Sequence, residues 1–249
     1  MRPKTSLCFI VWNEKRGCEL DLPQFDFSEF DEVFAIDGGS TDGTIELLQQ
    51  HGVAVHAQVR RSLNAAYWQA VETSACENIV VFFPKGTLDP SIVKQIKLLL
   101  LAGNDMVVAS RLIKGGRNEE DSRLFRPRKW GIRALSIFAA LCWCRRWPII
   151  QDVLHGVKGF TKHAFLEMNP SQEGVSIDLE MVVRAYRLRL PVCEFAVVET
   201  VGGGSHFKIL PTGIRMARFL WSELLGPRWS PSARGRSAPK RESTVLSGE

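Results

Sequence analysis

The stretch EVFAIDGGSTDGTIELLQQ, residues 32–50, changes its pattern halfway along. Residues 32–36 form a short apolar run that is typical of a buried strand, and this run ends at Asp37. Ser-Thr-Asp at 40–42 supplies good helix caps, and apolar residues within 44–50 recur at helical spacing. A glycine-rich turn lets the backbone approach a ligand closely, and a helix start favours anions. The stretch therefore predicts one strand–helix unit, joined either by an anion-binding turn or by a turn that is only well capped.

The same alternation of strand and helix continues along the chain. Apolar runs and helical spacings predict strands at 7–12, 32–36, 53–59, 79–83, 106–109, 156–160 and 192–198, and helices at 44–50, 64–75, 92–101, 130–143, 177–188 and 211–225. Strands separated by helices imply parallel βαβ units, so we predict an α/β fold with a mostly parallel sheet flanked by helices. We expect one domain over residues 1–225. Residues 226–249 have too few apolar side chains to offset the entropy of ordering, which predicts a disordered basic tail.

Composition is that of an ordinary globular protein, with 45% hydrophobic and 24% charged residues and a net charge of +5. Mild basicity suits an anionic partner, such as a phosphorylated metabolite or a membrane surface, but no nucleic-acid motif accompanies it. The six cysteines contain no CxxC pair, so we predict no zinc site. The apolar runs 7–12 and 134–143 are too short for a signal-peptide core and for a membrane span of about 20 residues, respectively. We therefore expect a cytoplasmic protein.

Polar residues follow the first two predicted strands. VWNEKRG, residues 11–17, places Asn13 and Glu14 directly after the first strand, and Asp37 ends the second. Because the carboxyl ends of parallel strands meet at one edge of a sheet, these residues are expected to share the binding crevice of the fold. A polar pair after a strand is also what an ordinary loop would contain.

Four motifs in this order resemble the family 2 glycosyltransferases with the GT-A fold: NE, DGGSTDGT, VVFFPKGTLDP and ASRLIKGG. The later stretches DVLHGVKGF, SIDLEMVVRA and GGGSHFK agree, so that the resemblance covers about residues 5–210. Within the family the chain looks most like enzymes of the dolichyl-phosphate mannose synthase type. The resemblance implies a Rossmann-like GT-A domain that takes a sugar from a nucleotide-sugar donor and loads it onto a polyprenyl phosphate.

The resemblance also implies roles for individual residues. Val11, Asn13, Glu14 and Asp37 match positions of the nucleotide pocket, with Asp37 holding the base; the family usually has a second aspartate where this chain has Gly38. Arg111 matches a loop near the acceptor, and Asp178 or Glu180 matches the region of the general base that a hydroxyl (glycan) acceptor needs. We expect the catalytic residues to be Lys85, Asp178 and Arg111. We expect the substrate-binding residues to be Val11, Asn13, Glu14, Asp37, Gly39, Arg60, Arg61, Gly86, Asp152, Glu180 and Ser205.

The stretch VVFFPKGTLDP, residues 80–90, departs from the family pattern. Family members have Asp-x-Asp here, which binds a divalent cation, whereas this chain has Pro84-Lys85-Gly86. Mg²⁺ or Mn²⁺ would lack its usual carboxylate ligands at this position. Lys85 could itself balance the leaving diphosphate, together with Arg60 or Arg61. Two other interpretations stay open: a metal held by other groups, and a protein that has lost catalysis.

Basic residues surround the apolar run 134–143, with several arginines before it and Arg145-Arg146 after it. Such a helix could lie in the interface of an anionic membrane, or it could be a core helix with solvated ends. We expect a glycosyltransferase on the cytoplasmic side, peripheral to the inner face of the membrane if the first interpretation holds. The alternative is a non-catalytic nucleotide-sugar or lipid-phosphate binding protein that retains the GT-A fold.

Overall fold

A computed structural model describes residues 2–117, 121, 126–145, 149–200 and 209–225. Its strands are β1 (Thr5–Val11), β2 (Glu32–Asp37), β3 (Ala54–Ala57), β4 (Asn78–Phe82), β5 (Met106–Ser110), β6 (Lys158–Thr161) and β7 (Val192–Ala196). Its α-helices are α1 (Lys15–Asp21), α2 (Thr44–Gln50), α3 (Leu63–Thr73), α4 (Ile92–Leu101), α5 (Pro127–Trp143), α6 (Lys162–Met168), α7 (Ile177–Leu188) and α8 (Ile209–Leu225). Two short 3₁₀ turns, Leu22–Gln24 and Phe27–Glu29, lie between α1 and β2.

The strands form one seven-stranded sheet in the order β3-β2-β1-β4-β6-β5-β7. Only β6 runs antiparallel to its neighbours β4 and β5. The remaining pairs are parallel, because helices carry the chain back across the sheet between them. The predicted α/β fold with a mostly parallel sheet is confirmed. The predicted tail, residues 226–249, lies outside the described residues.

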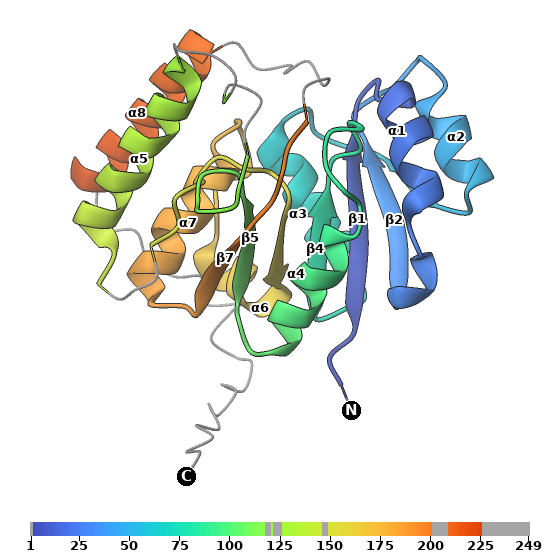
Figure 1. Cartoon of the computed structure of the whole chain (residues 1–249), viewed down its shortest axis with the longest axis horizontal. Coiled ribbons are helices and arrows are strands. Elements are labelled where there is room, and N and C mark those ends of the chain that lie inside the picture. The colour runs from blue at the N-terminus through green and yellow to red at the C-terminus, as the bar shows by residue number, and fades with distance from the viewer. Residues whose placement is uncertain (1, 118–120, 122–125, 146–148, 201–208, 226–249) are drawn as a thin grey trace.

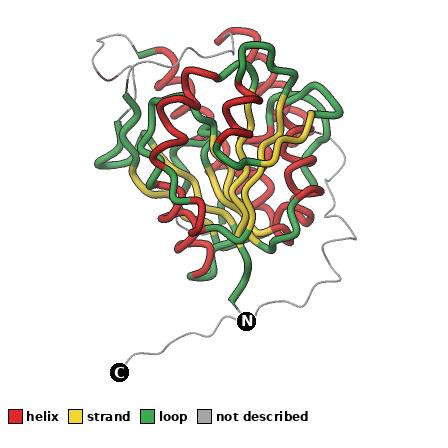
Figure 2. The backbone as a smooth tube through the Cα atoms, turned by 90° about the vertical axis from the view of Figure 1, so that its right-hand side faces the viewer, coloured by secondary structure: helices red, strands yellow, loops and turns green. Residues whose placement is uncertain are grey.

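Helices cover both faces of the sheet (Figure 2). Side chains alternate along β1, so that Leu7 and Phe9 pack with α1, α2 and α4, while Cys8 and Ile10 pack with α3, α6 and α7. Helices α5 and α8 lie side by side at one end of the molecule, beyond α7 (Figure 1). No helix in the described part of the chain is long and apolar enough to cross a membrane.

Candidate active site

A cavity of about 390 Å³ opens at the carboxyl ends of three central strands. Val11 ends β1, Gly38 follows β2, and Phe83 follows β4, and all three residues line it. Ligands bind at this edge in open α/β sheets. The predicted residues Val11, Glu14, Arg61 and Lys85 are brought together here. This cavity is called the donor cavity below.

Trp12 also lines the donor cavity, and its side chain is 52% exposed. Gly38 lies against it: a Cβ on this glycine would come within 3.2 Å of the Trp12 Cβ. A half-exposed indole in a cavity wall offers an apolar face on which a planar ring can stack. Trp12 was predicted only as the end of a strand; a large aromatic residue directly before Asn13 and Glu14 is the sequence signal that could have marked it.

Hydrogen bonds connect the loop that follows β1 to the loop that follows β2. Asn13 has a left-handed φ of 53°, donates its backbone N–H to Ser40 Oγ at 2.8 Å, and accepts from the Thr41 N–H at 2.8 Å. The Glu14 N–H donates to Thr44 Oγ1 at 2.9 Å. These bonds occupy the Asn13 side chain within the loops, outside the donor cavity, while they fix the backbone that presents Glu14.

Asp37 faces its own turn instead of the cavity. It is buried, and its carboxylate accepts the N–H groups of Gly39 at 2.9 Å and Ser40 at 3.0 Å. Gly39 has φ of +95°, a conformation that glycine adopts without strain, and it does not line the cavity either. The structure therefore gives Asp37 and Gly39 the task of shaping the turn, and Gly38 is the residue of this motif that lines the cavity.

The loop Pro84-Lys85-Gly86 is held tightly by α1. A Cβ on Gly17 would lie 2.0 Å from the Pro84 carbonyl oxygen, so only glycine allows this close approach. The buried Asp21 carboxylate accepts the Gly86 N–H at 2.9 Å. Gly86 has φ of +67°, and a Cβ there would lie 2.5 Å from Leu20. Gly86 is thus a structural residue of the loop, whereas Lys85 lines the donor cavity.

Lys85 Nζ lies 3.9 Å from a carboxylate oxygen of Glu14, and both side chains are partly buried. With Arg61, the cavity wall therefore combines two cations with one carboxylate. The neighbouring Arg60 is exposed and donates to Gln172 at 2.8 Å, so its guanidinium is held on the adjacent loop.

The loop Pro84-Lys85-Gly86 supplies no side-chain ligand for a divalent cation. Pro84 and Gly86 have no side-chain oxygen, and the nearby Asp21 is turned into the loop backbone. Within the described residues, no three side chains of His, Cys, Asp or Glu are grouped so that they could hold a metal ion. The charge in this cavity that could face a phosphate belongs to lysine and arginine.

A second cavity, of about 620 Å³, lies between α5, α8 and the start of α7. Its wall is mostly apolar, with Ile132 and Phe138 from α5 and Met216 and Leu220 from α8. The predicted residues Arg111 and Asp178 also line it, together with Arg128. This cavity is called the acceptor cavity below.

Arg111 is buried and bound by two carboxylates. Its Nε and Nη2 donate to Asp152 at 2.8 and 3.0 Å, and Nη1 donates to Glu199 at 3.1 Å. Burial opposes the charge of Asp152, yet the facing guanidinium lowers the pKa of Asp152 to about 2. Asp152 is fully buried, so it orients Arg111 and is not itself a cavity residue. Burial, followed by the nearby Arg111 charge, lowers the pKa of His155 to about 3, so this histidine is neutral.

Asp178 faces a lysine that comes from the middle of the sheet. Lys158 on β6 is fully buried, and its Nζ lies 2.6 Å from Asp178 Oδ1. Tyr67 donates to the Gly156 carbonyl at 2.8 Å and to Asp178 at 3.4 Å. The ion pair places the Lys158 ammonium beside Asp178 at the wall of the acceptor cavity.

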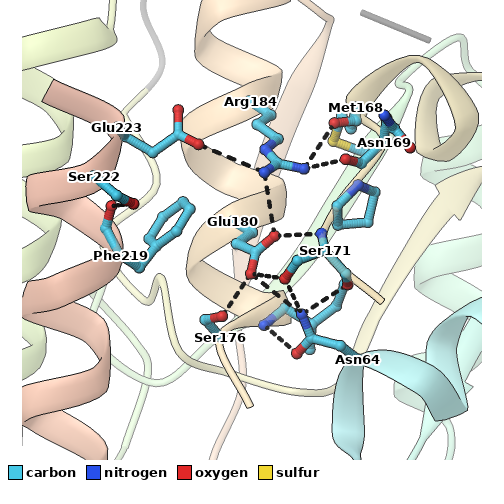
Figure 3. A network of polar contacts seen from close by, with 12 residues as sticks. Asn64, Met168, Asn169, Ser171, Ser176, Glu180, Arg184, Phe219, Ser222 and Glu223 are labelled. Atoms are coloured by element: carbon cyan, nitrogen blue, oxygen red, sulfur yellow. Dashed lines mark hydrogen bonds and ion pairs between the residues drawn. The ribbon is translucent and has the colours of Figure 1, made fainter. Parts of the chain in front are cut away.

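Glu180 is wholly engaged in a buried network (Figure 3). Its carboxylate accepts the Ser171 N–H at 2.7 Å and the hydroxyls of Ser171 and Ser176 at 2.6 and 2.5 Å. Arg184 lies 3.5 Å away and also contacts Glu223 of α8. This carboxylate therefore positions the loop 169–176, and that Glu180 binds substrate stays a prediction. Ser205, the remaining predicted site residue, lies outside the described residues.

Solved structures of one enzyme share this architecture. The chain matches glucosyl-3-phosphoglycerate synthase from Mycobacterium tuberculosis in complex with phosphoglyceric acid, with a TM-score of 0.65 and 17% identity over 90% of this chain and 79% of that one. The same enzyme with Mn²⁺ and UDP-glucose gives a TM-score of 0.65 and 18% identity, covering 90% and 78%. The fold is the GT-A glycosyltransferase fold. At this level of identity the likeness concerns the fold alone.

One curated relative is Glycosyltransferase AglJ from Haloferax volcanii, which is 29% identical over 155 residues. The match covers 62% of this chain and 49% of the relative, so the chain spans about half the length of that protein. No protein-family model matches the chain. The expected likeness to glycosyltransferases is thus supported, while the dolichyl-phosphate mannose synthase subtype stays a prediction.

Proposed function

We propose that this protein is a glycosyltransferase that takes a sugar from a nucleotide-sugar donor. The observation that carries the proposal is the donor cavity, at the ligand-binding edge of a GT-A fold, with an indole and cations in its wall. Trp12 offers a stacking face for the base, and Lys85 and Arg61 offer positive charge for the diphosphate. A relative named as a glycosyltransferase and a neighbour solved with UDP-glucose support the same donor class.

Lys85 is proposed to do the electrostatic work at the leaving group. As the acceptor oxygen bonds to the anomeric carbon, the bond to the diphosphate breaks and its electron pair stays on the departing diphosphate. A cation placed there in advance stabilises that charge. The Pro-Lys-Gly loop is rigidly held by α1, and Glu14 keeps the Lys85 ammonium at the cavity wall. The reaction then needs no divalent cation at this position.

The acceptor is proposed to be a polyprenyl phosphate. The acceptor cavity joins apolar walls suited to a hydrocarbon chain to the cation of Arg128, which suits a phosphate, while Arg111 in the same wall is paired with Asp152 and Glu199. A phosphate oxygen is already anionic, so that it attacks without a strong general base, and positioning supplies most of the rate. Lys158 offsets the Asp178 carboxylate, which would otherwise repel the incoming anion.

A polyprenyl-phosphate acceptor would place the protein on the cytoplasmic face of a membrane. Helix α5 carries the exposed side chains Ile137 and Leu141, and α8 carries Trp221 and Leu225. Arginines on the same helices, such as Arg133, could add about 1 kcal/mol each near anionic lipid. A peripheral contact through α5 and α8 would bring the acceptor cavity to the lipid.

Two observations favour other functions, and each supports one further candidate function. Asp178 lines the acceptor cavity as a carboxylate, which suits a general base for a glycan hydroxyl. The absence of carboxylates at Pro84 and Gly86 suits a protein that binds nucleotide-sugars or lipid phosphates without turnover.

The donor class is tested by titration calorimetry with UDP, GDP and dTDP and their sugar derivatives, each in EDTA and again in Mg²⁺ or Mn²⁺. We expect at least one nucleoside diphosphate to bind in EDTA and to raise the melting temperature, since a ligand at 100 times its Kd adds about 2.7 kcal/mol of stability. Trp12→Ala should weaken the binding of that nucleotide. Trp130→Ala should not, although Trp130 on α5 is comparably exposed. Absence of binding by all of them, with and without metal, would end the proposal.

A further inference from the structure

The donor and acceptor cavities share two wall residues. Leu63 is the first residue of α3, and Val175 lies two residues before α7; both line the two cavities. Both side chains are apolar and half-buried. The cavities therefore adjoin at an apolar boundary formed by Leu63 and Val175, with Lys85 lining one cavity and Asp178 lining the other.

One carboxylate positions both sides of this boundary (Figure 3). Asn64, next to Leu63, donates from Nδ2 to Glu180 Oε1 at 3.2 Å. Ser176, next to Val175, donates from Oγ to the same oxygen at 2.5 Å. A charged acceptor with several donors fixes the neighbouring backbone more firmly than a neutral one would.

The two segments are also bonded directly. The Ile177 N–H donates to Asn64 Oδ1 at 3.0 Å, and the Asn64 N–H donates to the Gly174 carbonyl at 3.2 Å. Both bonds hold Asn64, next to Leu63, and they lie on either side of Val175 along the chain. The spacing between the two side chains is therefore set by the fold before any ligand binds.

Sugar transfer requires the donor carbon and the acceptor oxygen to approach to about 3–3.5 Å. With the donor in one cavity and the acceptor in the other, as in the proposed function on which this inference rests, the transferred sugar lies where the cavities meet. We propose that Leu63 and Val175 contact that sugar and select it by size. They are specificity-determining residues, and Glu180 is the positioning residue behind them.

Selection of this kind has a known scale. One methylene more or less in an apolar site discriminates between ligands by roughly 10- to 200-fold. Val175→Phe adds bulk at the boundary and should exclude the sugar. Val175→Ala removes bulk and should admit a larger substituent, such as an acetamido group in place of a hydroxyl.

The test separates the sugar from the nucleotide. For whichever of UDP, GDP and dTDP binds, calorimetry compares the free diphosphate with its sugar derivatives: UDP-glucose and UDP-N-acetylglucosamine, GDP-mannose, or dTDP-glucose. The variants are Val175→Phe, Val175→Ala and Leu63→Ala. Glu173→Ala is the control, because Glu173 is an exposed residue of the same loop that lines neither cavity.

We expect every variant to bind the free diphosphate within about twofold of wild type. The affinity ratio of sugar-nucleotide to diphosphate should fall at least tenfold in Val175→Phe and stay unchanged in Glu173→Ala. If the diphosphate binds normally and this ratio is the same in Val175→Phe, Val175→Ala and Leu63→Ala as in wild type, the boundary has no role in selection and the inference is overturned. If wild type binds none of UDP, GDP and dTDP, the donor assignment fails first and removes the inference with it.

Discussion

Replacing Glu180 by glutamine removes a charge from the buried network while keeping the shape of the side chain. Oε1 of this carboxylate faces three donors, from Asn64, Ser171 and Ser176, and Oε2 faces the Ser171 N–H and Arg184. Glutamine offers one acceptor oxygen, and its NH₂ group only donates. The orientation that keeps the oxygen at Oε1 turns the NH₂ group against the Ser171 N–H and the Arg184 guanidinium.

The magnitude follows from what these two donors lose. A hydrogen bond to a charged group contributes about 1.5–3 kcal/mol, and breaking a buried ion pair costs about 3–5 kcal/mol. Arg184 keeps its contacts with Glu223 at 3.5 Å and with the Met168 carbonyl at 3.3 Å, so the cost of breaking its ion pair with Glu180 lies at the low end of this range. We expect Glu180→Gln to lower the free energy of unfolding by about 3–4 kcal/mol, a large share of the 5–15 kcal/mol of a typical domain.

Urea unfolding followed by circular dichroism measures this loss, with the slope m checked for a common transition. Glu167→Gln is the matched control: the ion pair of Glu167 within the described residues is with His163, at 3.8 Å on α6, and the change should alter stability by less than about 0.5 kcal/mol. A Glu180→Gln protein within 1 kcal/mol of wild type would refute the reasoning, because the network would then not depend on the charge.

Three further predictions concern charge and surface. The affinity for a nucleoside diphosphate should persist in EDTA and fall about 100-fold in Lys85→Ala. If Mn²⁺ restored the wild-type affinity to this variant, a metal and not the lysine would balance the diphosphate charge. Because the folded pKa of His155 is about 3, below its unfolded value near 6.5, the unfolded state binds the extra proton. The free energy of unfolding should therefore fall as pH drops from 7 to 5, by up to about 1.4 kcal/mol per pH unit, and His155→Gln should flatten this dependence. Urea unfolding at each pH measures it, and the same pH dependence in wild type and variant would contradict the prediction. Leu141→Glu should reduce sedimentation with anionic vesicles more than Leu98→Glu, since both leucines are exposed but only Leu141 lies on α5; equal effects would point away from this helix.

The sequence predicted all seven strands and most helices, because each buried segment carries its own periodic apolar pattern. The helix α1 was missed, since KRGCELD is short and polar and gains its helix by packing Gly17 against the Pro-Lys-Gly loop. The antiparallel direction of β6 was also missed. Strand direction depends on where the chain returns to the sheet, and the residues of β6 do not encode it.

The sequence predicted a site at the edge of the sheet where the donor cavity lies, but it could not show which side chains the protein itself holds. Asp37, Asp152 and Glu180 were expected at the substrate, whereas their partners in three dimensions hold them inside the protein. A carboxylate after a strand looks the same in sequence whether it meets a ligand or a backbone N–H. Val175 carried no signal at all, because its position between two cavities depends on the folding of segments more than 100 residues apart.

The most direct measurement is transfer itself. A sugar-labelled nucleotide-sugar, chosen as the tightest binder in calorimetry, is incubated in EDTA with polyprenyl phosphate in anionic vesicles, and the label in the extracted lipid is counted. We predict that the label appears in the lipid with wild type and is reduced about 100-fold with Lys85→Ala. A protein that binds the nucleotide-sugar yet moves no label to the lipid, in EDTA or in Mn²⁺, would contradict the proposed reaction and favour a binding protein with the same fold.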